Sequence, residues 1–387
     1  MKARASWTDR WRRHRERDLR RGPGRFTAIG AAGSVQAPEG AARVNLAGKT
    51  VIPALIDAHI HPATDRLTLE AQMRQKARFG VGAVLGLGLD TGTAAFDVRG
   101  TPVAGGALLR TAGRGITAPE PGRTEAPHWV TTEDEAARGR PRAGRPESGH
   151  GQDLGGRSRR QAYTKLSPAL YRAVIDEAHA HGLRVAAHIF ALEDAKGLLA
   201  AGIDAFAHGV RDRDIDEEFL QMVQERPQVV LIPNLPDRGV AADLGWLAGQ
   251  VPAGELEKLQ AGSTDRPEAQ RAFGIQARNL AKLSEAGMTI AMGTDGFSPW
   301  SQHVEMADMV AAGMTPAQVI VAATRNSAAL LQLTESGTIE TGKRADFVVL
   351  DANPLDDITN TRRIAAVYLL GAAVDRSADG APATATR

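Results

Sequence analysis

The feature that most constrains this chain is a short apolar stretch, residues 51–62, that ends in two histidines. Its β-branched residues predict a buried strand, and His59 and His61, two positions apart, lie on one face of such a strand. Imidazole nitrogens are good zinc ligands, so two rings at a strand end can converge on one ion. Short motifs often match by chance, however, and an isolated pair can also be a polar strand end that bonds only to backbone.

Three further apolar strands downstream end in a residue that can bind a metal: His188, His208 and Asp295. Helical segments separate these strands, which is the pattern of parallel βαβ units. Active sites of (β/α)8 barrels lie at the C-terminal ends of the strands. We therefore expect all five side chains to meet at one rim of a barrel.

The composition excludes several classes of protein. The chain has 387 residues, no cysteine and a net charge of +2, with 43% hydrophobic residues. Disulfides and thiolate metal sites are therefore impossible, and the overall charge makes no case for nucleic-acid binding. No apolar run is long enough to span a bilayer, and the N-terminus lacks the apolar core of a signal peptide, so we expect a cytoplasmic protein without a membrane partner.

The fold class that we predict is α/β, with a TIM-like barrel over residues 53–336. Residues 26–52 and 337–376 show the residue pattern of short strands and predict a small β-sandwich built from both chain ends. Residues 1–25 are crowded with arginine and predict a basic, disordered-like N-terminus. Residues 137–161 show neither helical nor strand periodicity where the fourth βα unit is due, so we expect strand four of the barrel to be disrupted.

Several motifs accompany these residues: Pro53-Ala54-Leu55-Ile56-Asp57-Ala58-His59-Ile60-His61, Ala178-His179, Ala201-Gly202-Ile203-Asp204, Ala207-His208-Gly209, Gly293-Thr294-Asp295 and Gly342-Lys343-Arg344-Ala345-Asp346. Together they resemble the amidohydrolase superfamily, the metal-dependent hydrolases with a urease-like barrel. The resemblance is nearest to the prolidase-like and imidazolonepropionase-like branch. It covers about residues 26–376, apart from the aberrant segment.

The resemblance implies that His59, His61 and Asp295 hold one metal and that His188 and His208 hold a second. It also implies a carboxylated lysine on strand four that bridges the two ions, but residues 137–161 contain no lysine. Lys165 is the nearest, and its place beside a helix start indicates a surface residue. We expect one or two divalent ions, with zinc as the metal.

A pair of compensating reading-frame shifts is our hypothesis for this departure. Residues 152–161 can be encoded so that the same bases, read one position later, give Lys-Ile-Trp-Val-Asp-Asp-Arg-Gly-Gly. This alternative peptide is an apolar strand with a leading lysine, as the family has at strand four. The nucleotide sequence would test the hypothesis, because an in-frame gene without such a strand would contradict it.

The reaction that we expect is hydrolysis of a C–N bond in a dipeptide, N-acyl amide or cyclic amide, with a metal-activated water and Asp295 as general acid and base. Two alternatives stay open: a mononuclear deaminase or lactonase-like hydrolase, and a catalytically impaired remnant with a basic binding surface. We expect a small-molecule substrate and allow for a homo-oligomer. Candidate substrate contacts are His303, Arg238 and Trp300.

Overall fold

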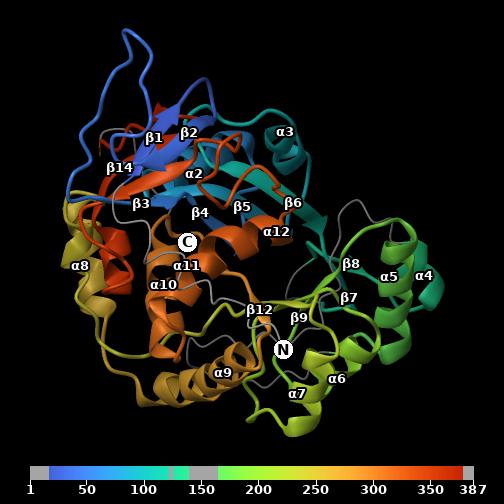
Figure 1. Cartoon of the computed structure of the whole chain (residues 1–387). Coiled ribbons are helices and arrows are strands. Elements are labelled where there is room, and N and C mark those ends of the chain that lie inside the picture. The colour runs from blue at the N-terminus through green and yellow to red at the C-terminus, as the bar shows by residue number, and fades with distance from the viewer. Residues whose placement is uncertain (1–16, 122–124, 139–163, 378–387) are drawn as a thin grey trace, which may run out of the picture.

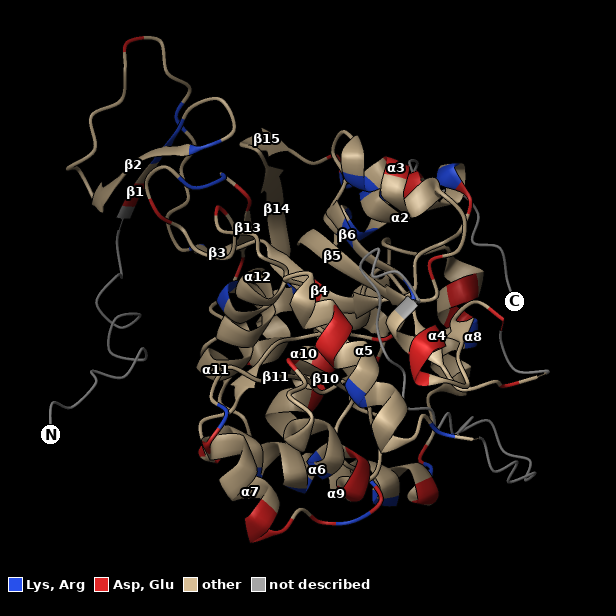
Figure 2. Ribbon diagram, turned by 90° about the vertical axis from the view of Figure 1, so that its right-hand side faces the viewer, with Lys and Arg blue, Asp and Glu red and all other residues tan. Residues whose placement is uncertain are grey.

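The computed structural model describes residues 17–121, 125–138 and 164–377. Figure 1 shows the parallel strands in the middle, a small antiparallel sheet at one end and helices around the parallel strands. In both Figure 1 and Figure 2, the antiparallel sheet and helices α6, α7 and α9 lie at opposite ends of the molecule. None of the described helices is both long and apolar enough to span a membrane.

Two parallel sheets form the centre. The first has the order β4-β5-β6 and the second the order β12-β11-β10-β9. The backbone N–H of Ala58 donates to the Met292 carbonyl at 2.8 Å, which joins β4 to the chain just beyond β12 and so brings the two sheets together. The strands are β4 (Leu55–Ile60), β5 (Val81–Gly88), β6 (Leu108–Arg114), β9 (Ala186–His188), β10 (Ala205–Ala207), β11 (Val230–Ile232) and β12 (Thr289–Ile290).

Helices alternate with these strands, and their ends follow ordinary capping rules. Helix α5 begins as the sequence predicts, with Ser167 accepting a hydrogen bond from the Leu170 N–H and Pro168 in the first turn. The others are α2 (Arg66–Arg78), α3 (Ala94–Gly100), α4 (Glu133–Arg138), α6 (Leu192–Ala200), α7 (Glu217–Gln224), α8 (Ala253–Gly262), α9 (Pro267–Glu285), α10 (Ser301–Ala311), α11 (Pro316–Val321) and α12 (Ser327–Leu330).

The antiparallel sheet combines strands from distant parts of the sequence. Its order is β15-β14-β13-β3, and a second sheet pairs β1 with β2. Phe26 packs against Phe347 with ring centroids 5.6 Å apart, which gives these two sheets an apolar core of their own. The strands are β1 (Arg17–Arg21), β2 (Phe26–Ala31), β3 (Thr50–Pro53), β13 (Phe347–Leu350), β14 (Ile364–Leu369) and β15 (Ala372–Ala373).

The stretch at residues 51–62 therefore divides between two sheets. Strand β3 pairs with β13 in the antiparallel sheet. Strand β4, separated from β3 by one residue, belongs to the parallel sheet. Between them the Ala54 N–H donates to the Asp346 carbonyl at 3.0 Å. The histidine-bearing strand is thus fixed at its start by the antiparallel sheet.

Two predicted irregular segments lie only partly within the described residues. In the arginine-rich N-terminus, residues 17–21 form β1, because antiparallel pairing with β2 satisfies their backbone and lets Arg21 lie over the Tyr368 ring. Around the expected strand four, β7 (Ile116–Thr117) and β8 (His128–Trp129) form a short parallel pair. Residues 139–163 lie outside the described part of the chain, and with them most of the segment for which we proposed a frame shift.

Candidate metal centre

Five side chains predicted from the sequence lie at the C-terminal ends of the parallel strands. His59 is the second-last residue of β4, and His61 directly follows that strand. His188 ends β9, His208 follows β10, and Asp295 lies on the segment after β12. Because all these strands run in the same direction, their ends share one edge of the fold.

The Asp295 carboxylate is the point on which three of the imidazoles converge. Its Oδ1 lies 3.0 Å from Nε2 of His59 and 2.9 Å from Nε2 of His61. Its Oδ2 lies 3.5 Å from Nε2 of His208. The ligand atoms of His59, His208 and Asp295 all lie within 4.8 Å of one another, which is close enough for one ion.

This donor set fits a divalent metal. Asn234, just beyond β11, accepts a hydrogen bond from Nδ1 of His59 at 2.8 Å, which leaves Nε2 as the nitrogen that carries a lone pair toward Asp295. A lone pair facing a carboxylate oxygen is repulsive unless a cation lies between them. Separations of about 3 Å also match those of neighbouring donors around one tetrahedral ion, roughly 3.3 Å.

Burial and charge act in opposite directions on Asp295. Burial by itself would raise the pKa of this carboxyl group. In the metal-free centre a proton on His59 and His208 takes the place of the ion. This positive charge, together with hydrogen bonds from His59 and His61, outweighs burial and holds the Asp295 pKa well below its ordinary value. Asp295 is therefore a carboxylate, the form that can bind a cation or accept a proton.

The backbone at the rim is held in unusual conformations. His208, Asn234 and Asp295 all have positive φ angles, of 65°, 41° and 53°. Non-glycine residues adopt such angles rarely, and they cluster at functional sites where surrounding contacts hold them in place. Gly293 contributes through its lack of a side chain, because a Cβ there would lie 2.8 Å from the Cβ of His59.

His188 lies beside this cluster, next to an aromatic and a cationic residue. Its ring centroid is 4.1 Å from that of His208 and 4.5 Å from that of Phe190. The Arg211 guanidinium carbon lies 3.4 Å from the Phe190 ring centroid, and the Arg211 N–H donates to the Phe190 carbonyl at 2.9 Å. These bonds tie the loops after β9 and β10 together at the metal centre.

The three predicted substrate contacts have other partners. His303 is 1% exposed, and its ring nitrogens lie 3.1 Å from the Thr361 hydroxyl and 3.0 Å from the Phe79 carbonyl. Trp300 is also buried and packs on Phe79. Both side chains fill the interior, since apolar packing and saturated hydrogen bonds remove them from the solvent that a substrate would displace. Arg238 is partly exposed and lies 3.6 Å from Asp308.

Asn234 and Asp57 are functional candidates that the sequence analysis did not single out. Each had a signal: Asp57 shares the strand face of His59, and Asn234 is a polar residue directly after an apolar strand. Lys165, considered as a substitute for the bridging lysine, bonds to Asp194 at 2.6 Å instead. Among the described residues, the cluster whose donor atoms are close enough for one ion comprises His59, His208 and Asp295.

Comparisons with known proteins point to one family. The model of the amidohydrolase family matches residues 154–374. An uncharacterised protein of Mycobacterium tuberculosis is 32% identical over 163 residues, which is 41% of this chain and 39% of the relative. The imidazolonepropionase of Deinococcus radiodurans is 28% identical over 198 residues, 47% of this chain and 46% of the relative. The matches thus span less than half of the length of these curated relatives.

Solved structures match over nearly the whole chain. A Bifidobacterium longum protein provisionally assigned as a prolidase has a TM-score of 0.73 and 27% identity, covering 92% of this chain and 88% of that one. A Xaa-Pro dipeptidase with bound methionine has a TM-score of 0.71 at 21% identity, with coverages of 92% and 94%. Phenylurea hydrolase B reaches 0.73 at 22% identity, with coverages of 95% and 94%. These neighbours indicate a TIM-like barrel fold with mixed α/β content.

Proposed function

Because this chain belongs to the amidohydrolase family, we propose that it is a metal-dependent hydrolase that cleaves a C–N bond in a dipeptide, an N-acyl amide or a cyclic amide. The observation that carries the proposal is the convergence of three imidazole Nε2 atoms on the Asp295 carboxylate. The prolidase and imidazolonepropionase names of similar proteins support the bond type.

In this proposal His59, His61, His208 and Asp295 hold a divalent ion, and His188 is the donor available to a second one. Zinc is the expected metal because it accepts mixed imidazole and carboxylate ligands. When bound, such an ion would polarise the substrate carbonyl. It would also supply a water that ionises near neutral pH.

Asp295 would carry the proton during the reaction. Its carboxylate takes a proton from the attacking water, whose oxygen adds to the carbonyl carbon. When the C–N bond breaks, the same carboxyl group returns the proton to the leaving nitrogen, so no other acid is needed. The depressed pKa of Asp295 keeps this group ionised before the reaction.

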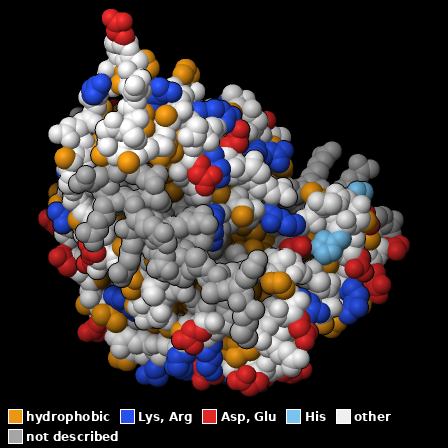
Figure 3. Space-filling view, in the orientation of Figure 1, with side chains coloured by type: hydrophobic (Ala, Val, Ile, Leu, Met, Phe, Trp, Pro, Cys, Tyr) orange, Lys and Arg blue, Asp and Glu red, His pale blue; other side chains and the backbone are white. Residues whose placement is uncertain are grey.

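A basic binding surface on an inactive remnant is the alternative, and much of the arginine-rich sequence behind it, in residues 1–16 and 139–163, lies outside the described part of the chain. Among the described residues on the face drawn in Figure 3, Lys and Arg side chains are interspersed with Asp and Glu. Nucleic acids bind to continuous basic surfaces, because affinity comes from many phosphate contacts.

The test is hydrolysis by the full chain, stripped of metal with a chelator and then reloaded with Zn²⁺. Dipeptides, N-acetyl amino acids and hydantoins form the substrate panel. Release of the free amine is measured for the first two, and ring opening to the N-carbamoyl amino acid for the hydantoins. Asp295→Asn should lower kcat at least 100-fold, whereas Asp194→Asn, a carboxylate paired with Lys165, should not. Ammonia release from adenosine with no amide cleavage would instead identify a deaminase, and no Zn²⁺-dependent turnover of any kind would contradict the proposal.

A further inference from the structure

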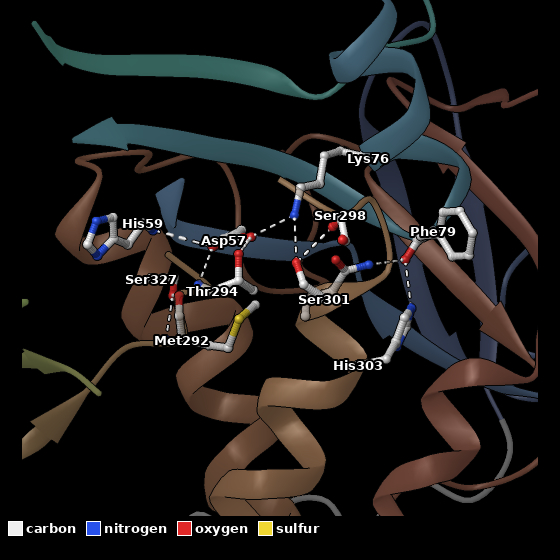
Figure 4. A network of polar contacts seen from close by, with 11 residues as sticks. Asp57, His59, Lys76, Phe79, Met292, Thr294, Ser298, Ser301, His303 and Ser327 are labelled. Atoms are coloured by element: carbon white, nitrogen blue, oxygen red, sulfur yellow. Dashed lines mark hydrogen bonds and ion pairs between the residues drawn. The ribbon is translucent and has the colours of Figure 1, made fainter. Parts of the chain in front are cut away.

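A fully buried carboxylate lies behind the metal centre and connects two of its parts. Asp57 is 0% exposed and lies two residues before His59 on β4. Its Oδ1 accepts hydrogen bonds from the Thr294 N–H at 3.0 Å and the His59 N–H at 3.3 Å. Its Oδ2 accepts from the Thr294 hydroxyl at 2.8 Å. Figure 4 shows Asp57 at the centre of this network.

Thr294 is the residue directly before Asp295, so these bonds act on the metal-binding carboxylate. The Asp295 N–H also donates to the His59 carbonyl at 2.8 Å, and Asp295 has the positive φ angle described above. A strained backbone persists only when its surroundings hold it in place. The two bonds from Thr294 to Asp57 supply part of that restraint.

Lys76 on α2 fixes Asp57 in turn. Its Nζ lies 2.9 Å from Oδ2 of Asp57, and the lysine is 1% exposed. The same Nζ donates to the Ser301 hydroxyl at 3.3 Å, and Ser301 bonds to the Ser298 carbonyl at 2.8 Å. One ammonium group therefore links β4, the segment that carries Asp295 and the start of α10 (Figure 4).

Stability alone does not account for a buried pair of this kind. Removing two charges from water is costly, and well-packed apolar residues in place of a buried ion pair are often as stable or more so. The pair is directional, however: both carboxylate oxygens are saturated by named donors, which fixes the position of Thr294. An apolar pair would fill the space without that directionality.

We propose that Asp57 and Lys76 form a positioning pair that sets Asp295 against the histidines of the metal centre, with Thr294 as the link. The inference rests on one part of the proposed function, namely that this centre binds a metal ion. Partners behind metal ligands typically change metal affinity or activity 10- to 100-fold when they are lost.

The experiment measures Zn²⁺ affinity of the full chain by competition with a chromogenic chelator. Thr294→Val removes one hydroxyl bond to Asp57 and keeps the side-chain shape. Thr324→Val is the matched control, because it makes the same change at a buried threonine whose hydroxyl bonds to the Ile320 carbonyl in a helix. The double variant Asp57→Asn/Lys76→Met removes both charges together, so that neither charge is left buried alone.

We expect Thr294→Val and the double variant to weaken Zn²⁺ binding roughly 10- to 100-fold, with thermal unfolding close to that of Thr324→Val. The visible absorption bands of bound Co²⁺ should also change in both variants and stay unchanged in the control, because they report ligand geometry. Zinc affinity and Co²⁺ spectra equal to those of the control would overturn the inference. A parent chain that binds Zn²⁺ but cleaves no substrate contradicts the proposed function alone, and a parent chain that binds none contradicts both.

Discussion

Arg211 is a cationic residue beside the candidate metal centre. Among the described residues, no carboxylate forms an ion pair with it. Its guanidinium carbon lies 3.4 Å from the Phe190 ring centroid, and the same ring also contacts His188 and His208. Burial lowers the Arg211 pKa to about 10, despite the attraction of Asp295, so the group remains charged at neutral pH. A partly desolvated cation gains from an anionic ligand. We therefore expect Arg211 to bind a carboxylate of the substrate.

Arg211→Met should raise KM for a dipeptide with a free carboxylate about 10- to 100-fold, the worth of one charge-assisted hydrogen bond. KM for the same dipeptide as its C-terminal amide should change little, because no charge is lost from that complex. Arg213→Met is the control, since Arg213 is exposed and pairs with Asp212. Steady-state kinetics with both substrates test the prediction, and an equal effect on the two would contradict it.

Helix α10 shows what sequence patterns leave undetermined at the scale of an element. The helix buries His303, Glu305 and Asp308, and burial raises the pKa of both acids. The pattern around His303 resembles a polar helix start near the site, and its true partners come from residues 79 and 361. Such partners are set by packing between distant segments, and the hydrophobic periodicity of a short stretch of sequence does not predict them.

The pH dependence of stability follows from His303. Burial lowers its pKa from 6.5 to about 3, so between these values the unfolded chain binds a proton that the folded chain does not. The free energy of unfolding therefore falls as the pH is lowered through this window. His303→Gln, which cannot titrate, should lose about 2 kcal/mol less than the parent chain between pH 7.5 and pH 5.

Urea unfolding at the two pH values measures this difference. His181→Gln serves as the control, because His181 is exposed and bonds to Glu177 on the same helix. Parallel pH slopes for the parent and His303→Gln would show that the buried imidazole does not behave as described.

The strand ends were the part of the molecule that the sequence made predictable. His59, His61, His188, His208 and Asp295 follow apolar runs, and parallel strands bring such ends to one edge whatever the intervening helices do. Lys76 could not be anticipated in the same way. A lysine inside an amphipathic helix usually reaches solvent, and only the packing of α2 against the sheet that contains β4 and β5 makes this one the partner of Asp57.

The candidate metal centre takes residues from both parallel sheets, so an ion bound there would act on the whole molecule. His59 and His61 come from the β4 sheet, whereas His208 and Asp295 come from the β10–β12 side. An ion that binds all of them is bound only by the folded chain. It therefore stabilises folding by mass action, by about 2.7 kcal/mol when free metal is 100 times the dissociation constant.

For a chain of this size we expect Zn²⁺ at that excess to raise the Tm of the metal-free protein by roughly 3 °C. The shift should grow with the logarithm of zinc concentration, and excess chelator should reverse it. His59→Ala removes one ligand from the more buried side of the centre and should abolish most of the shift. His179→Ala is the matched control, because that histidine lies on α5 and bonds to Asp204. If Zn²⁺ raised the Tm of His59→Ala as much as that of His179→Ala, the stabilising ion would have to bind elsewhere in the chain.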